Sequence, residues 1–279
     1  MNAFSEFKSF SPLVLVGCGN MGQALVRGWL AAGLSAEGLV IIDPQLDPKQ
    51  VPEFANATIV AHAADLPHDL RARLLLLAVK PQVINAVMKS KKPLVDSDTL
   101  VVSVAAGVTL MQMQKGLGDS ASLVRAMPNT PAAIGAGVTG LCASDGVSEA
   151  DCLLADAVMQ AAGQTVWVHD ESLMDTVTAT SGSGPAYVFH MVEALAAAAE
   201  ANGLPADAAM MLARQTIIGA AKLLDKEAHM PASALRERVT SPGGTTAAAL
   251  EVLMQSGELT ELMTRTVAAA KKRGEQLAD

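Results

Sequence analysis

Aromatic and charged residues are both scarce in this chain of 279 amino acids. Phe, Trp and Tyr make up 3% of it and Asp, Glu, Lys and Arg 17%, whereas hydrophobic residues reach 51%. So large an apolar fraction excludes a disordered chain. With 28 acidic against 20 basic residues, the net charge is −8. The acidic balance and the lack of rings for base stacking argue against nucleic acid as a partner and favour a small molecule.

Cysteine patterns, metal-binding motifs and long apolar runs are also lacking. The three cysteines, Cys18, Cys142 and Cys152, form no CxxC pair, and none of the five histidines lies in an HExxH motif. The longest apolar runs, 74–79 and 194–199, are far shorter than the roughly 20 residues of a membrane-spanning helix. The first twelve residues lack the apolar stretch of a signal peptide. We expect a soluble cytoplasmic protein without structural metal, disulfide or membrane contact.

Short, continuously apolar runs alternate with helical stretches in the first half of the chain. Such runs indicate strands covered on both faces, as in a parallel sheet between two layers of helices. The pattern predicts a doubly wound α/β domain over residues 1–169. A helix is expected over 20–32, and strands over 13–16, 39–42, 74–79, 99–104, 122–127 and, at the sheet edge, 163–169.

Helical segments rich in Ala, Leu and Met make up residues 170–279, which we expect to form a separate all-helical domain. Segment 185–202 is apolar on nearly every side, and a domain of this size is too small to bury it. It therefore predicts contact with a second copy of the chain. Helices are expected over 172–181, 185–202, 205–225, 233–239, 245–255 and 259–277.

A GxGxxG motif, with Gly17, Gly19 and Gly22, joins the first expected strand to the first expected helix. In dinucleotide-binding folds the first glycine permits a tight turn, the second lets the pyrophosphate approach the backbone, and the third lets helix and strand pack closely. Free N–H groups at the helix start also favour phosphate. Cys18 is expected to be a small filler rather than a reactive thiol, although a helix N-terminus can lower a thiol pKa.

Further candidates lie where the expected strands end. Asp43 comes 21 residues after Gly22, where a carboxylate can bind both adenosine ribose hydroxyls and repel a 2′-phosphate, or can simply form an Asp-Pro turn. Lys80 follows the apolar run 74–79. It can bind the cofactor phosphates, or it can simply be a charged residue at the end of the strand. Ala105–Gly107 follows the next strand, and its small residues leave room for a flat ring.

The segment 240–246, TSPGGTT, opens the helix expected over 245–255. Free amides and hydroxyls at a helix start can bind a carboxylate. The alternative is an ordinary N-cap, since Ser and Thr commonly cap helices, but two glycines plus two threonines exceed what a cap requires. His190 lies in an apolar stretch and is expected to be a core residue rather than an acid–base catalyst.

Several of these segments together resemble pyrroline-5-carboxylate reductase, the enzyme of the last step of proline synthesis. In chain order they are VGCGNMGQAL (16–25), LAVKPQ (77–82), VSVAAGV (102–108), RAMPNTP (125–131), TSGSGPAY (180–187) and TSPGGTTAAAL (240–250). They extend over nearly the whole chain, and the last two are highly specific. The resemblance implies an oxidoreductase with an N-terminal Rossmann domain and a C-terminal helical dimerisation domain, whose dimers often assemble into decamers.

The resemblance also implies roles for individual residues. Pro128 and Asn129 would lie near the nicotinamide, the Thr246 hydroxyl would point at the substrate's ring nitrogen, and Glu227 would lie near that site. The substrate carboxylate would bind the loop formed by Ser241, Gly243, Gly244, Thr245 and Thr246. Together with Asp43, the other cofactor-binding residues would be Val16, Gly17, Cys18, Gly19, Asn20, Met21, Ala78, Val79, Lys80, Pro81, Ala105, Ala106 and Gly107.

Two positions depart from the family pattern. Many members carry Ser or Arg-type residues after the second strand, which suit the 2′-phosphate of NADPH, whereas this chain has Asp43 and Pro44. Many also place an Asn after the third strand, where Ala63 lies here. We therefore expect NADH to be used at least as well as NADPH.

These features predict NAD(P)H-dependent reduction of L-Δ1-pyrroline-5-carboxylate to L-proline, with Thr246 as the catalytic residue. Two alternatives stay open. A β-hydroxyacid dehydrogenase would need a catalytic lysine in the first interdomain helix, and residues 170–187 contain none. A dinucleotide-sensing regulator would not need TSPGGTT, and no helix-turn-helix with basic flanks is evident.

Overall fold

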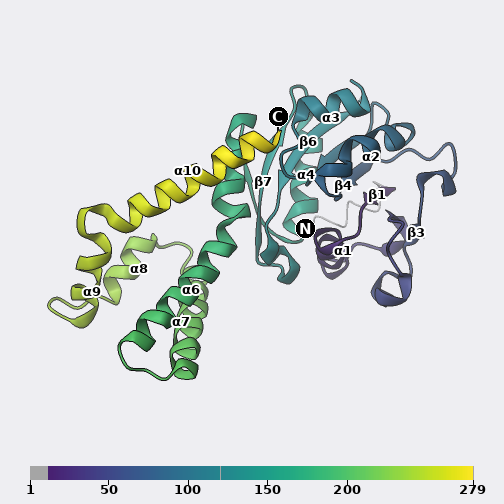
Figure 1. Ribbon diagram of the computed structural model, residues 1–279. Coiled ribbons are helices and arrows are strands. Elements are labelled where there is room, and N and C mark those ends of the chain that lie inside the picture. The colour runs from purple at the N-terminus through teal and green to yellow at the C-terminus, as the bar shows by residue number, and fades with distance from the viewer. Residues whose placement is uncertain (1–11, 120, 279) are drawn as a thin grey trace. The chain divides into compact units, whose positions relative to one another are not determined.

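The computed structural model describes residues 12–119 and 121–278, which form two compact units (Figure 1). The first unit holds Met1–Ser183 together with Ala270–Asp279, and the second holds Gly184–Ala269. This division differs from the predicted boundary after residue 169, because the turns and short helix that follow pack on the sheet, where Met174 is fully buried. No helix of the described residues has the length and apolarity needed to cross a membrane.

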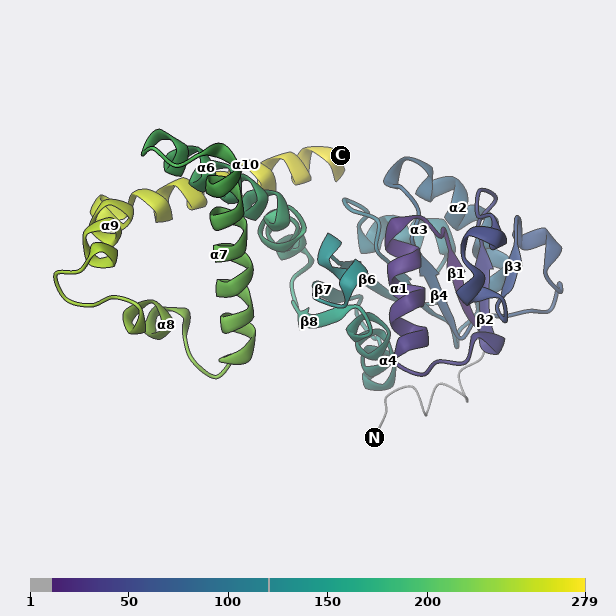
Figure 2. The same ribbon diagram turned by 90° about the horizontal axis from the view of Figure 1, so that it is seen from below.

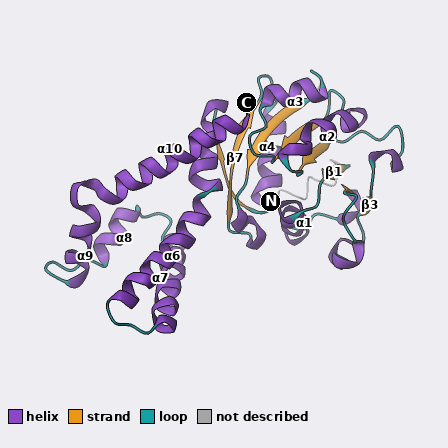
Figure 3. Cartoon of the chain, in the orientation of Figure 1, coloured by secondary structure: helices purple, strands orange, loops and turns teal. Residues whose placement is uncertain are grey.

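The first unit contains an eight-stranded sheet in the described part of the chain (Figure 3). Its strand order is β3-β2-β1-β4-β5-β6-β7-β8, and all neighbours are parallel except β6 and β7. This is the doubly wound arrangement that the apolar runs predict. The strands are β1 Leu13–Val16, β2 Leu39–Ile42, β3 Thr58–Val60, β4 Leu74–Leu77, β5 Leu100–Ser103, β6 Ser122–Met127, β7 Gly137–Ala143 and β8 Gly163–Trp167.

Two apolar cores, one on each face of the sheet, explain why the central strands are apolar throughout. In β1, Leu13 and Leu15 join one core, whereas Val14 and Val16 join the other. Helices α1 (Asn20–Ala31) and α4 (Glu149–Gln160) cover the first core, and α2 (Ile84–Lys91) and α3 (Leu110–Leu117) cover the second (Figure 2). Alternate side chains of each strand thus enter different cores, which removes the polar–apolar alternation of a one-sided sheet.

Strands β3 and β7 were not among the predicted strands. β3 has only three residues, which is too short for a reliable apolar run. β7 contains Gly137 and Gly140, which weaken a strand signal. A side chain at Gly140 would collide with Val177, so close packing of the following helical segment accounts for this glycine.

The segment predicted as a helix over 172–181 is helical throughout, but only its middle is α-helix. α5 covers Met174–Val177 and is followed by a π-helix, Thr178–Gly182. The Thr178 hydroxyl donates to the Met174 carbonyl, and the Ser181 hydroxyl donates to the Val177 carbonyl. Such bonds bend helices, and a π-turn in a helix frequently marks a functional site.

The second unit is helical, as predicted from residue 170 onward. α6 and α7 pack on each other, yet much of their apolar surface stays open. Exposed apolar residues on α6 include Val188, Phe189, Met191 and Leu195. The surface of α6 therefore matches the predicted need for a second copy of the chain. The helices are α6 Gly184–Ala201, α7 Ala206–Lys226, α8 Ala232–Arg238, α9 Thr245–Met254 and α10 Glu258–Ala278, whose last turns belong to the first unit.

Candidate functional site

The carboxyl ends of the central strands bring the predicted nucleotide-binding residues together. Val16 lies in register with Ile42 on one side and with Leu77 on the other, and Leu77 lies in register with Ser103. The residues that follow these strands therefore begin at the same sheet edge. In doubly wound sheets this edge is where ligands bind.

The first glycine of the motif is fixed by the backbone around it. Gly17 has φ +89°, and its N–H donates to the Ile42 carbonyl at 3.0 Å. A Cβ at this position would lie 2.6 Å from the Ala78 carbonyl oxygen and 2.7 Å from Val79 Cγ1. Only glycine fits this turn, which supports the role that the motif predicts for it.

The second glycine and the helix that follows leave an open cradle. A Cβ at Gly19 would meet nothing within 4 Å. Helix α1 has Gly19 as its N-cap, with no side-chain cap and no acidic residue in its first turn. Its first N–H groups and positive dipole end therefore suit a phosphate. The third glycine, Gly22, packs so closely on the Gly17 carbonyl that no side chain fits.

Cys18 lies in this loop, and burial makes its thiol unreactive. Its exposed fraction is 3%, and burial, followed by the charge of Asp43, raises the thiol pKa to about 12. The thiol therefore stays protonated at neutral pH, in agreement with its interpretation as a filler.

We expect Cys18→Ala to retain nearly full activity, because the thiol is buried and protonated and the backbone hydrogen bonds of this residue do not depend on its side chain. Steady-state rates at saturating cofactor measure the effect. Loss of most of the activity in a folded Cys18→Ala protein would contradict this prediction and point to a chemical role for the thiol.

Asp43 joins the glycine loop directly. Its Oδ2 accepts a hydrogen bond from the Cys18 N–H at 2.6 Å, and its Oδ1 accepts from the Gln45 N–H at 2.8 Å. The carboxylate thus lies between the end of β2 and the loop after β1. Asp43 therefore does more than form a turn with Pro44, which was the alternative interpretation of this pair.

The two other strand-end loops also lie at this edge. Lys80 is exposed after β4, and it precedes a short 3-10 turn that starts at Pro81. After β5, Ala105 is buried, Ala106 is exposed and Gly107 has φ +75°. Their assignments to the cofactor remain predictions.

Asn129 has structural partners on both ends of its amide. Its Nδ2 donates to the Ser181 carbonyl at 3.1 Å, and its Oδ1 accepts from the Val138 N–H at 2.9 Å. It therefore ties the loop after β6 to β7 and to the π-helix, while Pro128 beside it is buried. The predicted place of these two residues near the nicotinamide is untested, and Asn129 has a clear role in holding the loop.

Sequence reasoning missed a buried ion-pair network behind this loop. Arg125 in β6 is 4% exposed, and its guanidinium lies 3.2 Å from Glu171 Oε1 and 3.6 Å from Asp175 Oδ1. Glu171 Oε1 also accepts from the Leu110 N–H at 2.7 Å, at the start of α3. One charged residue in the otherwise apolar run of β6 was the available signal.

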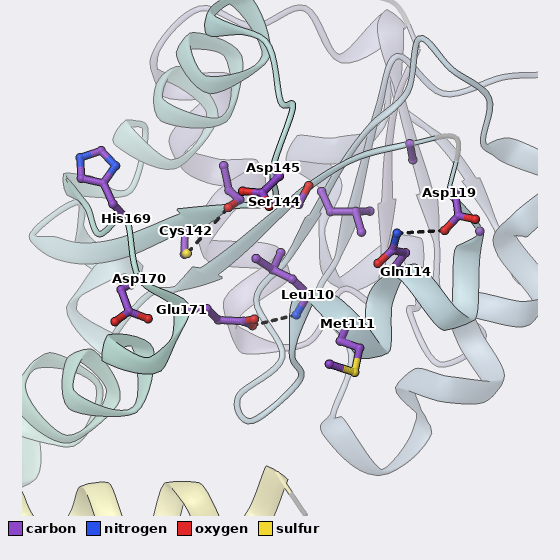
Figure 4. A pocket seen from close by; sticks show the side chains of 14 residues that line it. Leu110, Met111, Gln114, Asp119, Cys142, Ser144, Asp145, His169, Asp170 and Glu171 are labelled. Carbon is purple, nitrogen blue, oxygen red and sulfur yellow. Dashed lines mark hydrogen bonds between the residues drawn. The ribbon is translucent and has the colours of Figure 1, made fainter.

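Glu171 also lines a pocket of about 600 Å³ beside α3 (Figure 4). The carboxylates of Asp119, Asp145 and Asp170 line it as well, yet the described residues contain no group of His, Cys, Asp or Glu suited to a metal ion. The Glu171 carboxylate already binds Arg125 and the Leu110 N–H, so it is not a free acid–base group.

The predicted substrate loop lies in the second unit. Gly243 has φ +68°, and the Gly244 N–H donates to the Ser241 carbonyl at 3.0 Å. Gly244 is the N-cap of the ten-residue helix α9, which has no side-chain cap. Thr246 is half-buried in the first turn, whereas Ser241 and Thr245 are exposed. The threonines therefore do not act as the ordinary cap that was the alternative interpretation.

Two other residues of the second unit lie outside this loop. Glu227 is the C-cap of α7, and its Oε2 lies 3.7 Å from His229 Nε2. His190 is not the core residue that we predicted: its side chain is 81% exposed and its Nδ1 lies 3.0 Å from Glu193 Oε2. Helix α6 is apolar, but within one chain few of its residues are covered.

Comparisons with known proteins agree with this arrangement. The profile of the family "Pyrroline-5-carboxylate reductase dimerisation" matches residues 171–277, and the profile "NADP oxidoreductase coenzyme F420-dependent" matches residues 12–107. A pyrroline-5-carboxylate reductase of Haemophilus influenzae is 40% identical over 86% of this chain and 88% of its own. One from Pasteurella multocida is 38% identical over 95% of this chain and 97% of its own. The chain belongs to the pyrroline-5-carboxylate reductase family.

Solved structures of the family share the whole fold. The pyrroline-5-carboxylate reductase of Coxiella burnetii superposes with a TM-score of 0.87 at 36% identity, covering 97% of this chain and 99% of its own. The pyrroline carboxylate reductase of Plasmodium falciparum, solved with NADP bound, gives a TM-score of 0.78 at 27% identity, covering 96% and 98%. The predicted Rossmann and helical dimerisation domains are therefore confirmed as the family's fold.

Proposed function

We propose that this chain reduces L-Δ1-pyrroline-5-carboxylate to L-proline with NAD(P)H. The observation that carries the proposal is family membership along nearly the full chain, combined with an uncapped, glycine-rich helix start in each unit. Such helix starts suit the two anionic groups of the reaction, the cofactor's pyrophosphate and the substrate's carboxylate. The reductase replaces the β-hydroxyacid dehydrogenase and the regulator as the interpretation of the sequence.

The nicotinamide, when bound, supplies the hydride that is added to the imine carbon, and the ring nitrogen takes up one proton. In the proposal, the backbone N–H groups of the first turn of α1 bind the pyrophosphate, and the N–H groups of Gly243 and Thr245 bind the substrate carboxylate. The Thr246 hydroxyl orients the ring nitrogen. A threonine hydroxyl is too weak an acid to protonate an imine alone, so water or an iminium formed beforehand supplies the proton. Positioning and electrostatics then account for the rate.

We further propose a homodimer as the smallest active assembly, and a cytoplasmic location. The open apolar surface of α6 and α7 supports the dimer, and the three free thiols, Cys18, Cys142 and Cys152, are compatible with the cytoplasm. A decamer of five such dimers is the larger assembly that the family resemblance implies. Neither nucleic acid nor a membrane is among the proposed partners.

The direct test is an assay of the purified protein with pyrroline-5-carboxylate and, in parallel, NADH or NADPH. Proline should form in equal amount to the nucleotide oxidised, as measured by mass spectrometry and nucleotide absorbance. If neither nucleotide supports proline formation, the proposed function is wrong.

We expect Thr246→Ala to reduce kcat about ten-fold while the affinity for the cofactor stays unchanged. A hydrogen bond contributes about 0.5–1.5 kcal/mol net, and the upper end applies near developing charge. Thr246→Ser is the matched control because it keeps the hydroxyl, and its kcat should remain close to that of the unchanged protein. Equal kcat values in the Ala variant and the unchanged protein would remove the role of Thr246.

A further inference from the structure

We infer that Asp43 makes this enzyme selective for NADH over NADPH, an inference that rests on the proposed function for the identity of the cofactor. The carboxylate stands where β2 ends, beside the loop that is proposed to bind the pyrophosphate. Its two oxygens are held separately, Oδ2 by the Cys18 N–H at 2.6 Å and Oδ1 by the Gln45 N–H at 2.8 Å. To rotate away from the loop it would have to break two hydrogen bonds.

A carboxylate held in this way still has free acceptor capacity. Each ionised oxygen can accept a second hydrogen bond, so the pair can receive the two neighbouring hydroxyls of an adenosine ribose. A 2′-phosphate replaces one of those donors with a group carrying close to two negative charges at neutral pH. Asp43 would then face a like charge at short range, and it cannot withdraw without releasing the glycine loop.

In the described part of the chain, neither Lys49 nor Arg27 is well placed to compensate. The first basic residue after Asp43 is Lys49, and another acid, Asp47, lies between them. Arg27 on α1 is already engaged: its Nε lies 2.9 Å from Glu53 Oε1, its Nη2 donates to Gln23 at 3.2 Å, and its guanidinium lies 5.9 Å from the centre of the Phe54 ring. A 2′-phosphate would have to draw Arg27 out of all three contacts.

The selectivity would set this chain apart from the Plasmodium falciparum relative, whose structure holds NADP. The two structures superpose over nearly their whole length, so the inferred selectivity would come from the Asp43 side chain of this chain rather than from a different fold. Asp43 is therefore a specificity-determining residue, and it also positions the loop through Cys18.

The test measures binding of NADH and NADPH to the purified protein by nucleotide fluorescence, without pyrroline-5-carboxylate. We expect NADH to bind about ten-fold more tightly than NADPH or better, equivalent to about 1.4 kcal/mol. Asp43→Asn keeps the shape and removes the charge, and Asp43→Ser removes both the charge and most of the side chain. In both variants the preference should shrink to within a few-fold or reverse. 5′-AMP and 2′,5′-ADP, which differ only in the 2′-phosphate, should then be tested as competitors of NADH. A difference between their affinities would locate the effect of Asp43 at the adenosine end of the cofactor.

Asp47→Asn is the matched control, because Asp47 also accepts a hydrogen bond from the N–H two residues ahead, that of Lys49, at 3.0 Å. It should leave the NADH preference unchanged. Tighter binding of NADPH by the unchanged protein, an unaltered ratio in both Asp43 variants, or no binding of either nucleotide would overturn the inference. If Arg27→Met weakens the binding of 2′,5′-ADP but not that of 5′-AMP, Arg27 binds the 2′-phosphate and the inference also fails.

Because no imine is present, this result is independent of the reductase assay. A ten-fold NADH preference without any proline formation would leave the role of Asp43 intact and reject the proposed substrate. Proline formation with NADPH as the better cofactor would support the proposed substrate and reject the role of Asp43.

Discussion

Arg125→Met should lower the free energy of unfolding by about 3 kcal/mol, more than any single exposed ion pair contributes. The Arg125 side chain is 5% exposed and faces Glu171 and Asp175, which are 29% and 16% exposed. Methionine fills a similar volume but leaves two carboxylates close together without their cation. The midpoint of urea unfolding, at one fixed protein concentration, measures the loss.

Arg27→Met is the control for this prediction. Arg27 also pairs with a glutamate, Glu53, but its side chain is 50% exposed, so its removal should barely move the midpoint. Adding Glu171→Gln to Arg125→Met should recover part of the lost stability, since it removes one uncompensated charge. Equal midpoints for the Arg125 and Arg27 variants would show that the buried network does not stabilise the fold.

Phe189→Glu should turn the dimer into monomers and abolish activity. Phe189 is 64% exposed on α6 within one chain, in the region that matches the family's dimerisation profile. Burial of a phenylalanine is worth about 2 kcal/mol, and a two-fold interface contains it twice, so about 4 kcal/mol is lost. The dimer dissociation constant should then rise about a thousand-fold, which sedimentation at several concentrations can measure.

Leu153→Glu provides the matched control, because Leu153 is also 64% exposed but lies on α4 of the Rossmann unit. That variant should keep the dimer and its activity. A fully active monomer of the unchanged protein at nanomolar concentration would contradict the proposed assembly, whatever the Phe189 variant does.

The fold was predictable where burial alone determines the sequence. β1, β2 and β6 have the predicted bounds, because each strand fills two cores and admits only apolar side chains at most positions. β7 was not predictable, since its glycines reflect contacts with residues elsewhere in the chain: Gly140 meets Val177, and Gly137 meets the backbone of Ala132 and Ala162. The π-helix Thr178–Gly182 was not predictable either. The spacing of apolar residues does not distinguish the i→i+5 hydrogen bonds of a π-helix from the i→i+4 hydrogen bonds of an α-helix.

The residues assigned to the site stay predictions, and their contacts within the chain could not be predicted from the sequence. Spacing placed Asp43 at the ribose, but the bond from Cys18 depends on how the two loops meet in three dimensions. Asn129 was assigned to the nicotinamide by resemblance, whereas its amide holds Ser181 and Val138 in place. Arg125 was overlooked because it belongs to no known sequence motif. Its guanidinium is buried, and its ion pairs are visible only in the structure.

The first compact unit is discontinuous along the chain, since its last residues, from Ala270 on, are separated from the rest by residues 184–269. Topologically, the helical unit is an insertion between two pieces of the sheet-containing unit. Both apolar cores of the sheet are built from buried residues no later than Ala162. During synthesis the sheet can therefore pack before the helical unit is complete, as contiguous domains do. We expect the last turns of α10 to join the first unit only at the end, after all of 184–269 has been made.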